Sequence, residues 1–280
     1  MLYALAAVLQ QRAAVSEPLE NSLRLRLLLG LLHRPLWLAG LVCDVAAFLL
    51  QFWALDHGSL VLVQPLLVSG LLFALPLGTF VSHERMRRSD WIGAALVVIG
   101  LSVFLLVAQP DNGSSDAAPK VWVMLVVSIL AAVGMLIFAA QHAKGSRRAG
   151  LLAAAAGTLY GLTAALTKAC GHLLDQGLKH LFTSWKPYAL ATGGISGTVI
   201  DQSAYQGGPL NWSLPILTVT DPVVSIAIGA FVFGEGIEID GLAPLIEALA
   251  LVIMTIGVFK LSNSRLVTPA KEEGTAEERN

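Results

Sequence analysis

The 280-residue sequence is poor in charged residues, and this scarcity excludes most classes of soluble protein. Asp, Glu, Lys and Arg make up 13% of the residues, whereas a soluble domain carries about 25%. The charges gather in short blocks, and the apolar runs between them are roughly 20 residues long, enough to cross a bilayer as a helix. The sequence therefore predicts an all-α, polytopic membrane protein. No basic face suggests a nucleic-acid partner.

Cysteines and catalytic motifs are also scarce. The two cysteines, Cys43 and Cys170, both lie in apolar runs, so neither a disulfide framework nor a Cys/His zinc site is predicted. The sequence has no Gly-rich phosphate loop ending in Lys and Ser or Thr, no HExxH and no GxSxG. We therefore expect no cofactor and no enzyme activity.

Nine apolar segments are candidates for membrane helices. The first is too short to span a bilayer, and we expect that its first turns are missing from the sequence. A polar, charged tail follows the last segment, and its composition predicts disorder. The nine segments are 2–15, 36–55, 59–81, 91–108, 121–140, 149–171, 187–206, 212–233 and 242–261.

Lys and Arg predict the orientation of the chain, because the basic connections of a membrane protein face the cytoplasm. Basic residues are frequent in the connections after the first, third and fifth segments and in the tail. The opposite connections hold little beyond Lys120, Lys179 and Lys186. We therefore predict a plasma-membrane protein whose N-terminus is outside and whose C-terminus is cytoplasmic.

Two parts of the sequence resemble each other. "ALDHGSLVLVQP" (54–65) shares Ala, Gly, Leu and Pro with "AYQGGPLNWSLP" (204–215), and "LYALAAVLQQ" (2–11) resembles "LYGLTAALTK" (159–168). We predict two four-helix repeats, with a connecting helix that inverts the second relative to the first. The predicted divisions are 1–108, a loop and connecting helix over 109–148, the second repeat over 149–261, and the tail 262–280. Secondary transporters use this architecture, with the substrate near the bilayer midplane.

Ionisable residues deep in apolar segments predict a substrate site, because such residues normally face a cavity or a partner. Asp221 lies near the middle of the eighth segment, with Thr218 on the same helical face. Pro222 frees the backbone carbonyl of Thr218 for another partner. The alternative is that Asp221 only caps a bent helix locally. We also expect bends at Pro65 and Pro215.

The second, third and seventh segments offer further polar candidates. Asp201 corresponds to Gln51 in the repeat, Asp44 precedes Gln51 by two helical turns, and Gln64 lies beside a proline. For the glutamines the alternative is an ordinary hydrogen bond between helices. Lys168 is assigned a structural role. The predicted site comprises Gln51, Gln64, Asp201, Asp221, Thr218 and Asp44, and Asp201 and Asp221 are the metal ligands if a divalent cation is carried.

These segments resemble a known superfamily. "FWALDHGSLVLVQPLLVSGLLFALPLG" followed by "HERMRRSDWIGAALVVIG" resembles the EamA-like proteins of the drug/metabolite transporter superfamily. "AYQGGPLNWSLPILTVTDPVVSIAIGAFVFGE", which ends at Glu235, repeats the pattern. The nine segments and "WLAG" (37–40) are similar to the NIPA-type magnesium transporters. Phe48 and Gln51 depart from that branch, which has acidic and Asn positions there.

The resemblance implies a secondary transporter that works by alternating access. Its substrate would be a metabolite, a drug-like organic cation or a divalent cation, and a NIPA-like Mg²⁺ transporter is the specific alternative. A membrane scaffold or lipid-handling protein without a transport cycle is the alternative from another class. The expected partners are the lipid bilayer and the small solute or ion, and a homodimer is left open.

Overall fold

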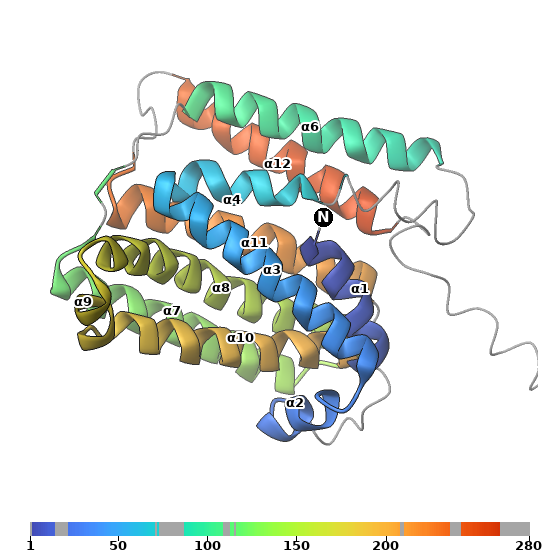
Figure 1. Ribbon diagram of the computed structural model, residues 1–280. Helices are drawn as coiled ribbons and strands as arrows, with labels where there is room; N and C mark the ends of the chain where they lie inside the picture. Colours follow the sequence, from blue (N-terminus) through green and yellow to red (C-terminus); the bar gives the residue numbers. More distant parts are fainter. Residues whose placement is uncertain are drawn as a thin grey trace, which may run out of the picture.

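The computed structural model describes residues 2–14, 22–70, 72, 87–108, 113–114, 116–207, 210–235 and 242–263, and their regular structure is helical throughout (Figure 1). The prediction of an all-α protein is confirmed. The helices are α1 (Leu2–Ala14), α2 (Leu25–Leu31), α3 (Pro35–His57), α4 (Leu60–Val68), α6 (Arg88–Ala108), α7 (Pro119–Gln141), α8 (Gly145–Asp175), α9 (Leu178–Thr183), α10 (Lys186–Gly207), α11 (Leu210–Val232) and α12 (Ala243–Ser262).

Six of the described helices are long and apolar enough to cross a membrane: α3, α6, α7, α8, α11 and α12. The polytopic class is thereby confirmed, while the count of nine stays a prediction. In the described residues α1 has 13 residues and α4 has 9. Helix α10 has 22 residues, but its Thr, Ser, Asp and Gln residues make it less apolar than a typical span. The predicted tail from residue 264 on lies outside the described residues.

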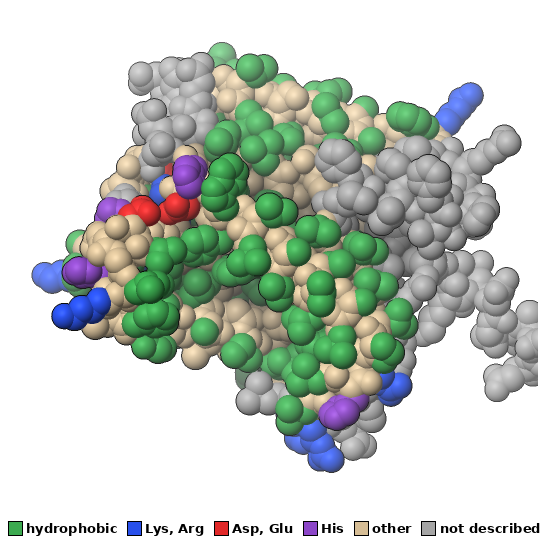
Figure 2. Space-filling model, in the orientation of Figure 1, with side chains coloured by type: hydrophobic (Ala, Val, Ile, Leu, Met, Phe, Trp, Pro, Cys, Tyr) green, Lys and Arg blue, Asp and Glu red, His purple; other side chains and the backbone are tan. Residues whose placement is uncertain are grey.

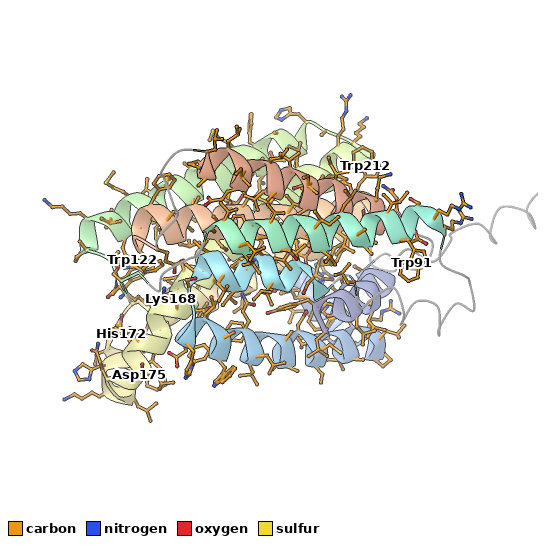
Figure 3. All side chains as sticks on the ribbon, turned by 90° about the horizontal axis from the view of Figure 1, so that it is seen from above. Trp91, Trp122, Lys168, His172, Asp175 and Trp212 are labelled. Atoms are coloured by element: carbon orange, nitrogen blue, oxygen red, sulfur yellow. The ribbon has the colours of Figure 1, made fainter. Side chains whose placement is uncertain are left out.

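The surface of the bundle matches a membrane environment. Apolar side chains cover the face in Figure 2, and the charged and histidine side chains visible there lie toward the ends of the bundle. Trp91 and Trp212 lie toward one end and Trp122 toward the other (Figure 3). Tryptophan is enriched at both membrane interfaces.

Helix starts follow local sequence signals. Pro35 and Pro119 occupy the first turn of α3 and α7, where the missing N–H group of proline costs no hydrogen bond. Ser59 caps α4, and its Oγ accepts a hydrogen bond from the Leu62 N–H at 3.1 Å. Pro65 lies inside α4, and Pro215 and Pro222 lie inside α11; the bend expected at each stays a prediction.

Helix α8 forms the centre of the bundle. In its most apolar 18-residue window 83% of the residues are buried, compared with 17% in α7. It packs against α10, α11, α7 and α3. Gly157 and Gly161 permit the close approach of α11, because a Cβ on Gly157 would lie 2.9 Å from the Thr220 Cβ. Small residues at four-residue spacing allow this kind of close packing in membranes.

The helix pairs follow a simple exchange pattern. Within each half, α1 packs on α3 and α8 packs on α10 (Figure 1). Between the halves, α3 contacts α8 and α1 contacts α10. Helix α4 packs on α11, and α6 packs on α12. In the predicted repeats, α1, α3, α4 and α6 of the first half correspond in order to α8, α10, α11 and α12 of the second. Replacing each helix by its counterpart gives the same set of contacts. Two inverted repeats would produce this pattern, but the repeats and their boundaries remain a prediction from the sequence.

Candidate functional site

A central cavity of about 970 Å³ lies between helices α1, α3, α4, α8, α10 and α11. Each of these helices contributes polar side chains to a wall that is otherwise apolar. Four of the helices contribute the residues that the sequence singles out. All six of those residues line this one cavity: Gln51, Gln64, Asp201, Asp221, Thr218 and Asp44.

Two buried side chains in the cavity wall retain hydrogen-bonding capacity. Asp201 is 6% exposed and Gln64 is 1% exposed. Within the described part of the chain, neither the amide oxygen nor the amide nitrogen of Gln64 has a hydrogen-bond partner, and Oδ1 of Asp201 has none. Tyr205 bonds to the Asp201 carboxyl group. Buried polar atoms without partners are costly, so a bound solute is the natural partner for these atoms.

Helix α11 contributes an acid and a hydroxyl to the cavity. The Ser225 hydroxyl donates to Asp221 Oδ1 at 3.2 Å, and the Thr218 hydroxyl donates to the Leu214 carbonyl at 2.7 Å. The hydrogen bond of Asp221 is thus local to its helix, which is what the capping alternative would also give. Its side chain nevertheless borders the cavity and is only half-buried.

Helix α3 contributes Gln51 and Asp44, and α1 holds both of them. The Tyr3 hydroxyl donates to Gln51 Oε1 at 2.5 Å. The Gln10 amide donates to Asp44 Oδ2. Gln51 therefore takes part in a bond between helices, as its structural alternative predicts, and it also borders the cavity.

Sequence reasoning missed the tyrosines of the site. Tyr3 on α1 and Tyr160 on α8 both line the cavity, and Tyr160 interacts electrostatically with Asp201. Tyr3 hydrogen-bonds to Gln51, whereas Tyr160 hydrogen-bonds to Thr198 on α10. Both tyrosines stand at the same position of the repeated "LY" stretches, so the repeat itself contained the signal.

A buried ion pair lies beyond the cavity at one end of the bundle. Lys168 Nζ is 2.6 Å from Glu235 Oε1, and Lys168 is labelled in Figure 3. Glu235 also accepts hydrogen bonds from the N–H groups of Leu60 at 2.9 Å and Val61 at 2.8 Å, at the N-terminus of α4. The partner of Lys168 in this ion pair is Glu235 and not Glu247, the partner considered from the sequence; a structural role for Lys168 stays a prediction. We call this end of the bundle, with Lys168, Glu235 and the start of α4, the Lys168 end.

A second set of contacts reinforces the Lys168 end. Lys186 Nζ, at the start of α10, is 2.5 Å from Asp116 Oδ2, and the Trp122 indole donates to Asp116 Oδ1 at 2.8 Å. Partial burial acts to raise the pKa of Asp116, but the hydrogen bonds from Lys186, Trp122 and the Ala117 N–H outweigh it and lower that pKa below its ordinary value. The Ser114 N–H donates to the Phe233 carbonyl at 2.7 Å.

Comparison with known proteins identifies the family. Residues 3–106 match the EamA-like transporter family. An uncharacterised protein of Corynebacterium glutamicum is 30% identical over 258 residues, which are 92% of this chain and 89% of that protein. The chain belongs to the EamA-like drug/metabolite transporters.

More distant similarity reaches the magnesium branch of the same superfamily. Two probable magnesium transporters of Arabidopsis thaliana, NIPA2 and NIPA1, are 27% and 25% identical over 93 and 97 residues, respectively. These matches cover 33% and 35% of this chain and 27% and 29% of the Arabidopsis proteins. No solved structure matches the chain.

Membership of the drug/metabolite transporters decides between the classes considered from the sequence. The protein is an integral membrane protein that carries a small solute or ion, and its family consists of transporters and not of enzymes. The apolar helices and the central polar cavity agree with that class.

Proposed function

We propose that the protein is a secondary transporter that carries a cationic solute through the central cavity by alternating access. One observation carries this proposal: the described residues that line the cavity include Asp44, Asp201 and Asp221 but no Lys, Arg or His. Carboxylates inside a membrane are costly unless a partner compensates them. The described side chains of the wall supply no positive charge, so a cationic cargo would supply it.

The size and chemistry of the cavity favour an organic cation as the cargo. A volume of about 970 Å³ lies at the upper end of the range of small-molecule sites, about 300–1,000 Å³. In the described part of the chain, no three His, Cys, Asp or Glu residues lie together so as to hold a metal. A mostly apolar wall with separate acids suits an organic ammonium ion with an apolar body.

Mg²⁺ is the second candidate, because two relatives are named as probable magnesium transporters. Mg²⁺ usually binds through one or two carboxylates and keeps several of its waters. Asp201 and Asp221 would be the carboxylates for such a hydrated ion, and Gln64 would hydrogen-bond to its waters.

The contacts at the Lys168 end support alternating access. Glu235 follows α11 and pairs with Lys168 of α8, both in the predicted second half, and it bonds to the start of α4 in the first half. Opening this end requires Glu235 to leave α4. We infer that the arrangement is closed at the Lys168 end, which by the distribution of Lys and Arg faces outward in the plasma membrane. The homodimer stays a prediction.

Transport assays with isosteric variants test this function. Purified protein in proteoliposomes is expected to take up tetraethylammonium or, as the alternative, Mg²⁺. Asp201→Asn and Asp221→Asn should each reduce uptake at least about tenfold, because a hydrogen bond or contact to a charged group contributes about 1.5–3 kcal/mol. Asp175→Asn is the matched control, since Asp175 is exposed at the end of α8 outside the cavity. Unchanged uptake in both cavity variants would remove the proposed site.

A further inference from the structure

We propose that Trp37, Gln202 and Gln10 are positioning residues that act through Asp44. Together they form a directional chain of hydrogen bonds, the amide relay, which holds the Asp44 carboxylate ready for the cation. This inference rests on the proposed function, in which Asp44 belongs to the cation site.

The amide relay crosses three helices and is almost completely buried. The Trp37 indole on α3 donates to Gln202 Oε1 on α10 at 3.3 Å, and Gln202 Nε2 donates to Gln10 Oε1 on α1 at 2.6 Å. Gln10 Nε2 then donates to Asp44 Oδ2, back on α3. The exposed fractions of Trp37, Gln202 and Gln10 are 3%, 0% and 2%.

The direction of the amide relay follows from its first member. An indole N–H can only donate a hydrogen bond, whereas a glutamine amide has one accepting and one donating end. Because Trp37 donates, Gln202 must turn its oxygen toward the indole and its NH₂ group toward Gln10. The same rule makes Gln10 turn its NH₂ group toward Asp44. Trp37 thus decides which end of an amide the carboxylate meets.

This arrangement favours one protonation state of the Asp44 carboxyl group. Oδ2 accepts the hydrogen bond from Gln10, and this bond would be weaker if the proton of a neutral carboxyl group sat on the other oxygen. A hydrogen bond to a carboxylate is stronger than one to a neutral group. The amide relay therefore stabilises the negative charge that binds a cation.

Among the described residues, no positive group competes for Asp44. Tyr3 on α1, Tyr160 on α8, and Asp201 and Tyr205 on α10 are the titratable groups that interact with Asp44. Among the described residues that line the cavity there is no Lys, Arg or His. Amide donors therefore take the place of a basic side chain here, and they leave the charge of the carboxylate free for the cargo.

The amide relay also connects the two predicted halves. Trp37, Gln10 and Asp44 lie in the first half and Gln202 lies in the second, so two of the three bonds cross between the halves. When the halves move apart, Gln10 loses its contact with Gln202, and its amide is free to turn its oxygen toward Asp44. A protonated Asp44 then becomes favoured and the cation is released. The amide relay would in this way couple the conformation to the affinity for cations.

A double-mutant cycle tests the relay. Trp37→Phe removes the donor and keeps an aromatic ring, and Asp44→Asn removes the charge. Tetraethylammonium binding to the purified full-length protein should weaken roughly tenfold in Trp37→Phe, because the hydrogen bond from Gln10 to Asp44 is no longer held in place. A hydrogen bond to a charged group contributes about 1.5–3 kcal/mol. In the Asp44→Asn background, Trp37→Phe should have no further effect, because the two residues act as one unit.

The pH profile and a control separate positioning from simple packing. Proton competition with tetraethylammonium should extend to higher pH in Trp37→Phe, because the protonated Asp44 is no longer disfavoured. Trp53→Phe is the matched control, since Trp53 lies on the same helix with its side chain 65% exposed. The relay would be overturned if Trp37→Phe weakened binding equally with Asp44 and with Asn at that position, or if it left the pH profile unchanged. Binding by the wild type would in that case still support the proposed function. Failure of the wild type to bind or transport either tetraethylammonium or Mg²⁺ would overturn both.

Discussion

Glu235 receives three donors on its two carboxylate oxygens. One donor is the ammonium group of Lys168, and the other two are the N–H groups at the start of α4. The free N–H groups of a helix N-terminus carry partial positive charge, so an anion is favoured there. Glu235 therefore compensates a buried ammonium and a helix end together. The acid and the base of this pair are thus not interchangeable, because the N–H groups of α4 require an acceptor at position 235.

We therefore predict that a protein with Lys168 and Glu235 exchanged will be less stable than wild type, although it keeps both charges. Glu235→Gln removes the carboxylate that lies 2.6 Å from Lys168 Nζ, and breaking a buried pair by changing one member costs about 3–5 kcal/mol. The exchange, Lys168→Glu with Glu235→Lys, restores the two charges but turns an ammonium toward the two N–H donors of α4. We expect thermal unfolding in detergent at a lower temperature for both variants than for wild type.

A neutral pair provides the control for that measurement. Lys168→Met with Glu235→Gln removes both charges and keeps an acceptor for α4, so it should be more stable than the exchange. If the exchanged protein were as stable as wild type, the bonds to the start of α4 would contribute nothing.

At the scale of helices, glycine contacts determine how closely α6 and α12 pack. A Cβ on Gly100 would lie 2.7 Å from the Ala250 carbonyl oxygen and 2.7 Å from the Met254 backbone nitrogen. Backbone atoms cannot move aside as the end of a flexible side chain can. The two helices must therefore separate or tilt to admit even one methyl group at this position.

Gly100→Ala is therefore expected to destabilise the protein by about 1–3 kcal/mol, the usual cost of overpacking. Gly134→Ala is the matched control, because nothing lies within 4 Å of a Cβ added to Gly134 on α7. That control should be neutral or more stable by up to about 1 kcal/mol, since alanine is the better helix former. Equal melting temperatures for the two variants would contradict the close packing of α6 on α12.

Helix identity was easier to predict from the sequence than helix length. The apolar runs identify α3, α6, α7, α8, α11 and α12 as spans, because composition alone decides whether a segment suits a bilayer. Helix α8 extends beyond the predicted 149–171 at both ends, because its ends depend on turns that hydropathy does not register. Polar residues lower the apolar character of α10, and three of them, Thr198, Asp201 and Tyr205, line the cavity.

At the scale of the whole molecule, the candidate site could likewise be predicted only in part from the sequence. Asp44, Asp201 and Asp221 are predictable because an acid in an apolar run needs a cavity or a partner wherever the helices lie. Gln10 and Gln202 are not, because a glutamine has many ordinary roles and these two meet only when α1 and α10 become neighbours. Their contact joins residues 192 positions apart in the chain, and only the packing of the bundle brings them together.

The orientation of the whole molecule gives the last prediction. The short connections rich in Lys and Arg should face the cytoplasm, so Thr183 should be outside and His142 inside; both side chains are exposed. In a background of Cys43→Ala and Cys170→Ala, a membrane-impermeant maleimide should label Thr183→Cys on intact cells. It should label His142→Cys only after the membrane is permeabilised. The opposite pattern would place the Lys168 end in the cytoplasm. The cavity would then be closed on the cytoplasmic side, and it would load its cation from outside.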